Sequence, residues 1–192
     1  MRTFIRHQLR PAIAVLALLT LITGFAYPGV VTAIAQVAFP SQANGSFIVA
    51  NGTTVGSSLI GQSFDDPKYV WGRPSAAGKG YDGTSSAGSN LGPTSKALID
   101  RITASVDAMR QANGGGPVPV ELVTTSGSGL DADISPSAAE YQVNRVATAR
   151  GMTPDAVRAV IAKHTTQPLL GFLGEPQVNV LLVNLDLDGL LK

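Results

Sequence analysis

The longest apolar run in the chain lies near its N-terminus. From Ala12 to Phe39 almost every residue is apolar, and no Asp, Glu, Lys or Arg occurs between Arg10 and Asp65. A helix rises about 1.5 Å per residue, so a helix over this run exceeds the roughly 20 residues that cross a hydrocarbon core. The pattern therefore predicts one transmembrane helix over residues 12–39.

Charged residues flank this run closely on one side only. Arg2, Arg6 and Arg10 precede it, whereas every acidic residue and all other basic residues lie far beyond it. By the positive-inside rule, residues 1–11 are expected in the cytoplasm and residues 40–192 on the other side of the membrane.

A cleaved signal peptide is the alternative interpretation of the same segment. Its apolar part would end near Tyr27, a helix break would fall at Pro28–Gly29, and cleavage would follow the small residues of Ala33–Ala35. Against cleavage, the apolar part is long for a signal peptide and apolar residues resume up to Phe39. Both interpretations place most of the chain outside the cytoplasm.

Small residues form a strip along the predicted span. Ala17 and Gly24 are seven residues apart, close to two helical turns, and Thr20 lies between them on nearly the same side. Helices in lipid associate through such small residues, so the strip is predicted to pack against a neighbouring membrane helix. The alternative is that the span serves only as an anchor.

Three helices are predicted beyond the span, from apolar residues three or four positions apart and from end signals. Ser135–Pro136 is typical of a helix start, because Ser caps a free N–H and Pro fits the first helical position, and Gly151 suits the helix end. Thr153–Pro154 repeats the start signal. The predicted helices cover residues 94–113, 135–150 and 153–167.

Strands are predicted where β-branched residues alternate or where turn signals bound a short apolar run. Ser46–Ala50 lies between Asn44–Gly45 and Asn51–Gly52, two dipeptides typical of tight hairpin turns. Further strands are expected over Val118–Thr125 and Val178–Leu185. With the helices between them, these strands predict an α/β (α+β) extracytoplasmic domain behind a single N-terminal transmembrane helix.

A loop rich in Gly, Ser, Pro and Asn is predicted over residues 72–93. A loop of about 20 residues is uncommon unless it is functional or disordered. Beside it, Tyr69, Trp71 and Arg73 are candidates for a stacked cation–π cluster. Alternatively, the aromatic side chains fix the loop to the core.

Composition and charge narrow the functional classes. The sequence has 14 Lys and Arg against 13 Asp and Glu, a formal charge of +1, and therefore no basic surface suited to nucleic acid. Without Cys, it offers no disulfide scaffold, thiolate metal site or Cys nucleophile. A length of 192 residues suits one domain plus the membrane segment and argues against a multidomain enzyme.

Catalytic and nucleotide-binding motifs find little support. A Ser hydrolase needs a His, and His164 is the one His beyond the apolar run, while no Ser has the spacing G-x-S-x-G. The single His and scattered Asp residues predict no metal site. No Gly precedes Lys and then Ser or Thr as in a P-loop. Thr124–Asp131 either forms an anion-binding nest or is a turn satisfied by its own Ser and Asp side chains.

The order and spacing of several short motifs resemble the KdpC subunit of bacterial potassium-transporting ATPases. The resemblance covers essentially the whole chain, and no single motif is decisive. The motifs are Gly56–Phe64, Gly72–Ser75, Gly88–Gly92, Val118–Ser126, Ser128–Asp131, Ile134–Pro136, Tyr141–Gln142, Arg145–Ala147 and Asn179–Leu181.

The resemblance implies an uncleaved span and an accessory, non-catalytic subunit of a high-affinity potassium pump. The implied partners are a potassium-channel-like subunit, a P-type ATPase subunit and a small membrane peptide, with ATP and potassium handled by the complex and no cofactor bound by this chain. It implies a catalytic chaperone that raises the affinity of the pump for ATP. The rival class is a periplasmic or secreted enzyme or binding protein with a cleaved signal peptide.

The resemblance also suggests site residues. It implies a nucleotide contact at Gln142, which shares a helix face with Arg145. A domain outside the membrane cannot reach cytoplasmic ATP, so an indirect effect through contacts that differ between two pump states is the expectation from topology. The candidate interface or structural-loop residues are Trp71, Arg73, Ser75, Ser89, Asn90, Ser126, Ser128, Asp131 and Arg145.

Overall fold

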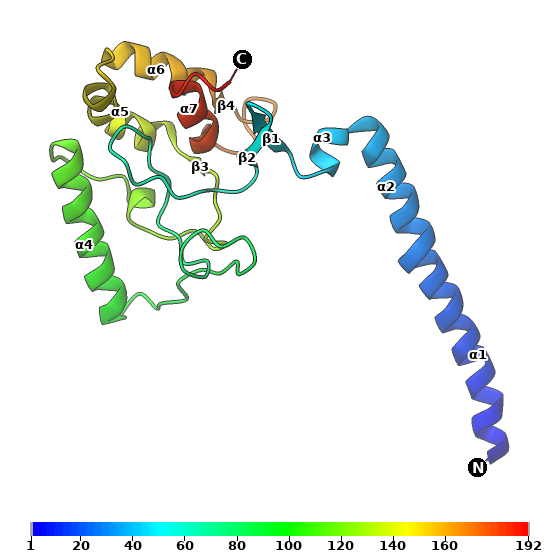
Figure 1. Cartoon of the computed structure of the whole chain (residues 1–192). Coiled ribbons are helices and arrows are strands. Elements are labelled where there is room, and N and C mark those ends of the chain that lie inside the picture. The colour runs from blue at the N-terminus through cyan, green and yellow to red at the C-terminus, as the bar shows by residue number, and fades with distance from the viewer. Residues whose placement is uncertain (1, 192) are drawn as a thin grey trace. The chain divides into compact units, whose positions relative to one another are not determined.

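The computed structural model describes the backbone of residues 2–191 and the side chains from residue 7 to residue 191. The side chains of Arg2 and Arg6, on which the predicted orientation partly rests, lie outside the described residues. The chain divides into two compact units, one ending at Ser46 and one beginning at Phe47, and each is described by itself (Figure 1).

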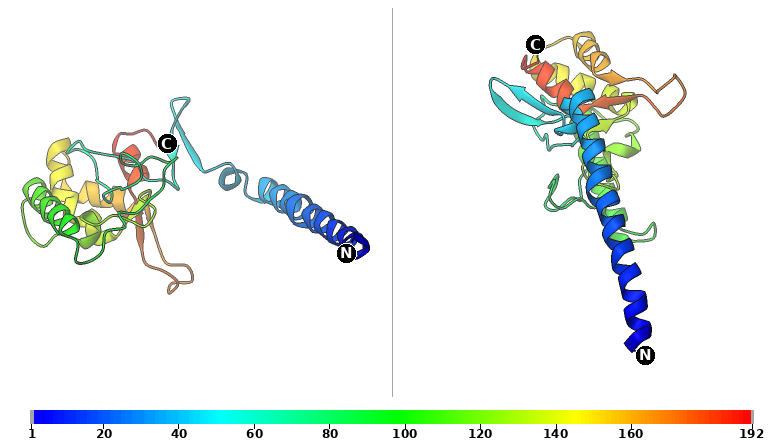
Figure 2. Two further views of the ribbon diagram at one scale, coloured as in Figure 1. Left: turned by 90° about the horizontal axis from the view of Figure 1, so that it is seen from below. Right: turned by 90° about the vertical axis from the view of Figure 1, so that its right-hand side faces the viewer.

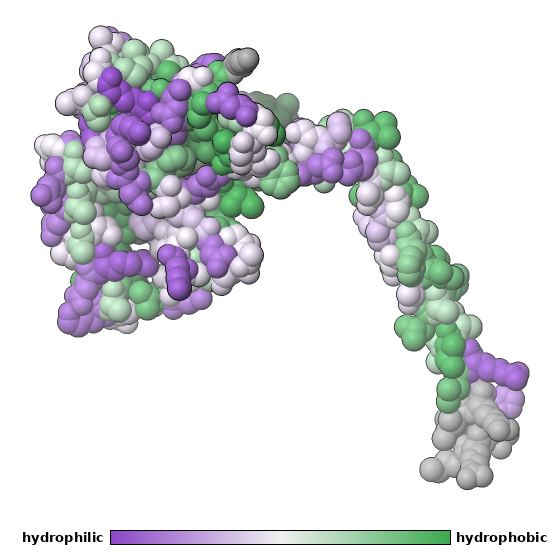
Figure 3. Space-filling view, viewed as in Figure 1, coloured by the Kyte–Doolittle hydropathy of each residue, from purple (hydrophilic) through white to green (hydrophobic). Residues whose placement is uncertain are grey.

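The first unit is helical. It contains α1 (Arg2–Thr20), the π-helical turn η1 (Leu21–Ala26), α2 (Tyr27–Ala38) and the short α3 (Pro40–Ala43). Its segment His7–Ala38 is long and apolar enough to cross a membrane, and Figure 3 shows its mainly hydrophobic surface. One N-terminal helix able to span a membrane is therefore confirmed.

The helix break that a signal peptide would place at Pro28–Gly29 does not occur, because α2 continues to Ala38. Instead the helix widens just before Pro28, where the Tyr27 N–H bonds to the carbonyl of Ile22, five residues back. Pro has no N–H, and its ring clashes with the carbonyl four residues earlier. The π turn accommodates this proline without ending the helix.

The second unit combines helices with two small antiparallel sheets, so the α+β class is confirmed. The elements of this unit are β1 (Phe47–Ala50), β2 (Thr53–Ser57), α4 (Lys96–Asn113), the 3-10 turn η2 (Val120–Leu122), β3 (Asp133–Ile134), α5 (Pro136–Arg150), α6 (Pro154–Lys163), β4 (Thr165–Thr166), β5 (Gln177–Asn179) and α7 (Val180–Leu187). One sheet pairs β1 with β2, and the other has the strand order β3-β5-β4.

The predicted hairpin at Asn51–Gly52 is confirmed. Both residues have positive φ, 51° and 78°, as a type I′ turn requires, and they join β1 to β2. Asn44–Gly45 is also a turn, but it follows α3 and joins no pair of strands.

The end signals of the helices are confirmed at most positions. Ser135 and Thr153 cap α5 and α6, each accepting a hydrogen bond from a backbone N–H three residues ahead at 3.2 Å. Gly151 ends α5 in the left-handed conformation, with φ 66°. The third helix is shorter than predicted and ends at Lys163, because Thr165–Thr166 pairs with β5.

One predicted strand is wrong, and another is confirmed only at its first two residues. In Val118–Thr125 the only regular structure is η2, and two prolines at positions 117 and 119 remove N–H donors that a sheet would need. In Val178–Leu185 the strand stops at Asn179, whose side chain caps α7 by accepting from the Leu182 N–H at 3.1 Å. Because α7 is buried on most sides, its apolar run has the pattern of a buried strand.

The core of the second unit forms between α5, α6, α7 and the three-stranded sheet, which lie side by side in Figures 1 and 2. The buried face of α5 is central to it. Its fully or nearly fully buried apolar members are Val70, Leu122, Ile134, Ala138, Ala139, Val143, Val146, Ala147, Val157, Ile161, Val178, Val180 and Val183.

Candidate functional site

Gln142 lies on the buried face of α5 with its side chain fully enclosed (0% exposed). Its Oε1 accepts from the Trp71 N–H at 2.9 Å and from Arg145 Nη2 at 2.6 Å. Its Nε2 donates to the carbonyls of Trp71 at 3.0 Å and Ala138 at 3.2 Å. Both amide hydrogens and both acceptor positions of the oxygen are therefore occupied by the protein itself.

Asn184 of α7 bonds the backbone in the same way at Val70, the residue before Trp71. It is 1% exposed, its Oδ1 accepts from the Val70 N–H at 2.8 Å, and its Nδ2 donates to the Val70 carbonyl at 2.9 Å. Two side-chain amides thus bond the backbone N–H and carbonyl groups of Val70 and Trp71, as a neighbouring strand would. We call Gln142 and Asn184 the amide clamp.

Arg145 closes the amide clamp from the next turn of α5. Its guanidinium stacks on the Trp71 ring, 3.7 Å from the ring centre, and its Nη1 donates to the carbonyls of Pro67 at 2.6 Å and Tyr69 at 2.9 Å. Its Nε donates to Asn113 Oδ1 at 2.9 Å. Among the described residues it forms no ion pair, so carbonyl oxygens stabilise the charge, and burial lowers the pKa of Arg145 to about 10.

The predicted cluster of Tyr69, Trp71 and Arg73 is not formed as such. The cation over Trp71 is Arg145, and Arg73 turns instead to Asp131 at 2.9 Å. The Tyr69 hydroxyl donates to Asp188, and the Trp71 ring packs under Arg145. The aromatic side chains therefore fix this segment to the core, which was the alternative interpretation.

A second set of contacts ties the loop over residues 72–93 to the turn over 125–131. Arg73 Nη1 donates to Asp131 and its Nη2 to the Thr125 carbonyl at 3.4 Å. Ser75 Oγ donates to the Gly129 carbonyl at 2.6 Å and accepts from the Tyr81 N–H at 2.7 Å. The loop is thus hydrogen-bonded to the domain at several points.

The turn over residues 125–131 satisfies its own donors. Ser126 Oγ accepts from the Gly129 N–H at 2.9 Å, and Ser128 Oγ accepts from the Leu130 N–H at 3.1 Å. A Cβ at Gly129 (φ 66°) would lie 2.5 Å from the Ala87 carbonyl, so loop and turn pack backbone against backbone. These contacts support the turn interpretation over an anion-binding nest.

Ser89 and Asn90 stand apart from this set. Their side chains make no hydrogen bond to the described part of the chain, and Asn90 has a positive φ of 51°. Their neighbour Gly88 packs closely on the backbone of Gly127.

A cavity of about 330 Å³ opens between the two sets of contacts. It brings together Trp71, Arg73 and Ser75 from the predicted list. Tyr81, which the sequence reasoning did not select, also lines it, and burial raises the pKa of Tyr81 to about 12. Its remaining lining residues are Ser63, Phe64, Asp65, Gly72, Pro74, Gly80, Met109 and Leu122.

His164 follows the last turn of α6, and its side chain is largely buried. Its Nε2 lies 2.7 Å from Asp186 Oδ2, which also accepts from Lys163 Nζ at 2.8 Å. The Lys163 hydrogen bond, with the His164 contact, lowers the pKa of the Asp186 carboxyl. Among the residues with described side chains, no group of His, Cys, Asp or Glu is arranged to hold a metal ion.

Sequence reasoning missed Asn184 and Asp186 as partners. Both interrupt the otherwise apolar run of α7. A lone polar residue in a buried run must find a hydrogen-bond partner, and that signal was available in the sequence.

The fold defines a class of protein: a small α+β domain preceded by one helix able to span a membrane. Residues 9–189 match the family described as "KdpC: K+-transporting ATPase, c chain". The chain belongs to the KdpC family.

Three relatives, each named potassium-transporting ATPase KdpC subunit, illustrate the similarity. The protein of Sorangium cellulosum is 60% identical over 185 residues, which cover 95% of this chain and 97% of the relative. The protein of Variovorax paradoxus is 57% identical, with 95% and 96% covered. The protein of Herpetosiphon aurantiacus is 52% identical over 191 residues, with 98% and 97% covered.

Proposed function

We propose that this chain is an accessory, non-catalytic subunit of an ATP-driven potassium uptake pump. The family match over residues 9–189, which includes nearly all of the apolar helix His7–Ala38, is the observation that carries the proposal. The helix anchors the chain with its N-terminus in the cytoplasm, and residues 40–192 lie outside. The proposed partners are a potassium-channel-like subunit, a P-type ATPase subunit and a small membrane peptide.

The proposed effect of the chain is to stabilise the complex and to raise the affinity of the pump for ATP. The effect is indirect, because the chain contacts two states of the pump unequally and so shifts their populations. A direct nucleotide contact at Gln142 stays a prediction from the resemblance. A ligand there would have to displace the Trp71 backbone and the Arg145 guanidinium from the fully buried amide.

The test compares the purified pump with and without this chain. We expect a higher KM for ATP when the chain is removed, and recovery when the full-length chain is added back. A photoreactive azido-ATP should label the P-type subunit and leave this chain unlabelled. Labelling of this chain that depends on Gln142 would contradict the indirect mechanism, and an unchanged KM would contradict the effect on ATP affinity.

The non-catalytic role rests on missing motifs. The sequence has neither a P-loop nor the D-K-T-G-T motif that P-type pumps phosphorylate. Purified full-length chain should therefore not hydrolyse ATP. Turnover that a single substitution in this chain abolishes would contradict the proposal.

The anchor can be tested on the native chain. Mass measurement of the mature protein should show the N-terminal segment retained, and protease added to spheroplasts should remove the domain. A mature N-terminus at Gln36 would show cleavage and favour the rival class of secreted or periplasmic proteins.

The strip of Ala17, Thr20 and Gly24 is proposed to pack on a partner span. A Cβ at Gly24 would meet only the Thr20 methyl group, at 3.8 Å, so this helix itself tolerates a larger residue there. Gly24→Leu should therefore leave membrane insertion intact while weakening copurification of the pump subunits. Leu19→Ala is the control and should have little effect. Equal copurification of both variants would contradict the packing role.

A further inference from the structure

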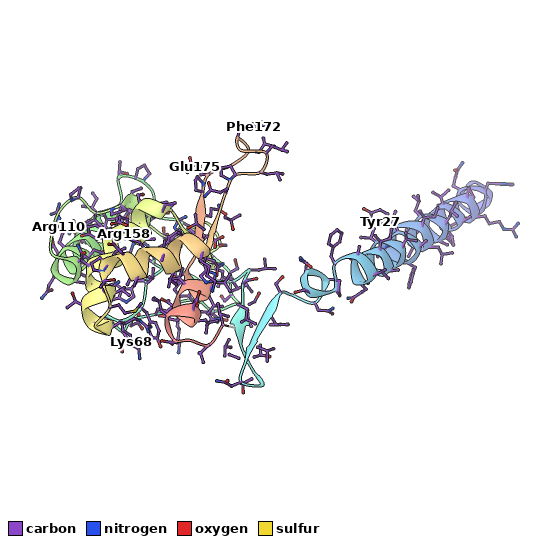
Figure 4. All side chains as sticks on the ribbon, turned by 90° about the horizontal axis from the view of Figure 1, so that it is seen from above. Tyr27, Lys68, Arg110, Arg158, Phe172 and Glu175 are labelled. Carbon is purple, nitrogen blue, oxygen red and sulfur yellow. The ribbon has the colours of Figure 1, made fainter. Side chains whose placement is uncertain are left out.

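The segment between β4 and β5 is a hairpin with an exposed apolar tip. Its residues Leu169, Leu170 and Phe172 are 69%, 76% and 73% exposed, and Leu173 is 50% exposed. In Figure 4 the labelled Phe172 lies at the tip, away from the helices of the unit, and Glu175 lies closer to them. We call Leu169–Leu173 the apolar tip.

The turn at the apolar tip holds a residue that suits it poorly. Leu170 and Gly171 have φ values of 56° and 79°, nearly the values of Asn51–Gly52 in the β1–β2 turn. Asn and Gly adopt this left-handed conformation readily, whereas Leu pays about 1–2 kcal/mol. A leucine at this position therefore indicates a role for its side chain outside the domain, since it makes the turn less stable.

The backbone of the apolar tip is prepared for an environment without water. The N–H groups of Leu169 and Leu173 each donate to the carbonyl of the other, at 3.1 and 3.0 Å, and the Gly171 N–H donates to the Pro168 carbonyl at 3.0 Å. Each unsatisfied backbone group would cost several kcal/mol in hydrocarbon. Most backbone N–H groups of the tip are already hydrogen-bonded, so they would avoid this cost.

The chemistry of the tip favours lipid over a protein surface. No charged residue occurs from Thr165 to Gly174. The few residues that dominate binding energy at protein interfaces are enriched in Trp, Tyr and Arg and poor in Leu, whereas the tip has only Leu, Phe and Gly. Leu and Phe are the residues that amphipathic segments bury at a membrane surface.

We propose that the apolar tip inserts into the lipid interface of the membrane. This inference rests on the proposed membrane anchoring and adds a second point of attachment for the domain. The ligand is the acyl-chain region of the bilayer, recognised without charge.

The experiment uses full-length chain in vesicles of phosphatidylethanolamine and phosphatidylglycerol, some carrying a doxyl quencher high on the acyl chain. Because the chain has no Cys, Phe172→Cys carries a single environment-sensitive fluorophore. Leu21→Cys in the span and Gln111→Cys on the exposed surface of α4 are the positive and negative controls. We expect doxyl lipid to lower the emission at positions 172 and 21 by about twofold and to leave position 111 unchanged.

The assembled pump provides the second arm. Quenching at position 172 should persist there, and Leu170→Asn should reduce it while leaving the fold intact, because Asn suits the turn. No quenching at position 21 would contradict the anchoring itself. Quenching at 21 but not at 172, or loss of quenching at 172 once the partner subunits are present, would overturn the insertion and leave the anchor standing.

Discussion

Helices α4 and α5 have similar signals in the sequence and very different surroundings in the structure. α4 is 18 residues long and has no buried residue, whereas seven of the 15 residues of α5 are buried. Both have apolar residues at helical spacing and a glycine at the end. Periodicity therefore predicts which face of a helix is apolar, but it does not predict how deeply that face is buried.

The difference lies in what each helix binds. α5 carries Gln142 and Arg145, whose polar groups satisfy the backbone of a segment about 70 residues earlier in the chain. α4 contributes Asn113 to this site from its last turn. α5 therefore makes long-range hydrogen bonds from its buried face, whereas α4 reaches this site only from its C-terminal end.

Loss of the Gln142 amide should have the largest effect. Gln142→Ala leaves the N–H and carbonyl of Trp71 and one Arg145 donor without their partner, so we expect a loss of about 3–5 kcal/mol in the free energy of unfolding. Urea unfolding of the full-length chain in detergent measures this free energy. The fluorescence of Trp71, the single Trp, follows the unfolding of the site because Gln142 bonds its backbone. Gln111→Ala on α4 is the control, and an equal loss there would break the comparison.

Replacing the Arg145 guanidinium should cost somewhat less. Arg145→Lys keeps the charge but loses the planar stack on Trp71 and most of the fixed hydrogen bonds, with an expected loss of about 2–4 kcal/mol. Arg158→Lys, at a solvent-exposed ion pair, should cost less than about 1 kcal/mol. Similar losses for both variants would show that burial of Arg145 adds nothing.

The link between the two helices can be tested alone. Asn113→Ala removes the acceptor of Arg145 Nε, and we expect a loss of about 1–2 kcal/mol with a red shift of Trp71 emission. Asn144→Ala, at an exposed position of α5, serves as the matched control. An unchanged unfolding midpoint for Asn113→Ala would mean that α4 does not contribute to the clamp.

The smallest effect is expected on the surface of α4. Ile99 is 54% exposed, so Ile99→Ala should change the unfolding free energy by less than about 0.5 kcal/mol. Val146→Ala, at a fully buried position of α5, should cost about 2 kcal/mol in the same assay. A larger loss for Ile99→Ala in the assembled pump than in the isolated chain would identify α4 as a subunit contact.

Local signals in the sequence predicted the helix ends well. Ser135, Thr153 and Gly151 act through backbone geometry within a few residues, and that geometry does not depend on the rest of the fold. The strand expected over Val178–Leu185 is wrong from Val180 onward for the opposite reason. Burial of α7 is a property of the whole domain, and an apolar run that is buried on all sides has no period.

The sequence singled out residues of the candidate site without showing their contacts. The resemblance identified Gln142 and Arg145, but the motifs could not show that both bind the backbone between Pro67 and Trp71. Such partners are more than 70 positions away and leave no local pattern. Their assignment needed the structure.

The π turn at Leu21–Ala26 has a consequence for scanning mutagenesis of the span. A π turn adds one residue to a helical turn, which rotates every later side chain by about 100° relative to an uninterrupted α-helix. Substitution effects from Ala12 to Thr20 and those after Tyr27 will therefore each repeat with helical period, but out of phase with one another. One side of α1 therefore does not continue as the same side of α2, so substitutions before and after the π turn probe different faces of the helix.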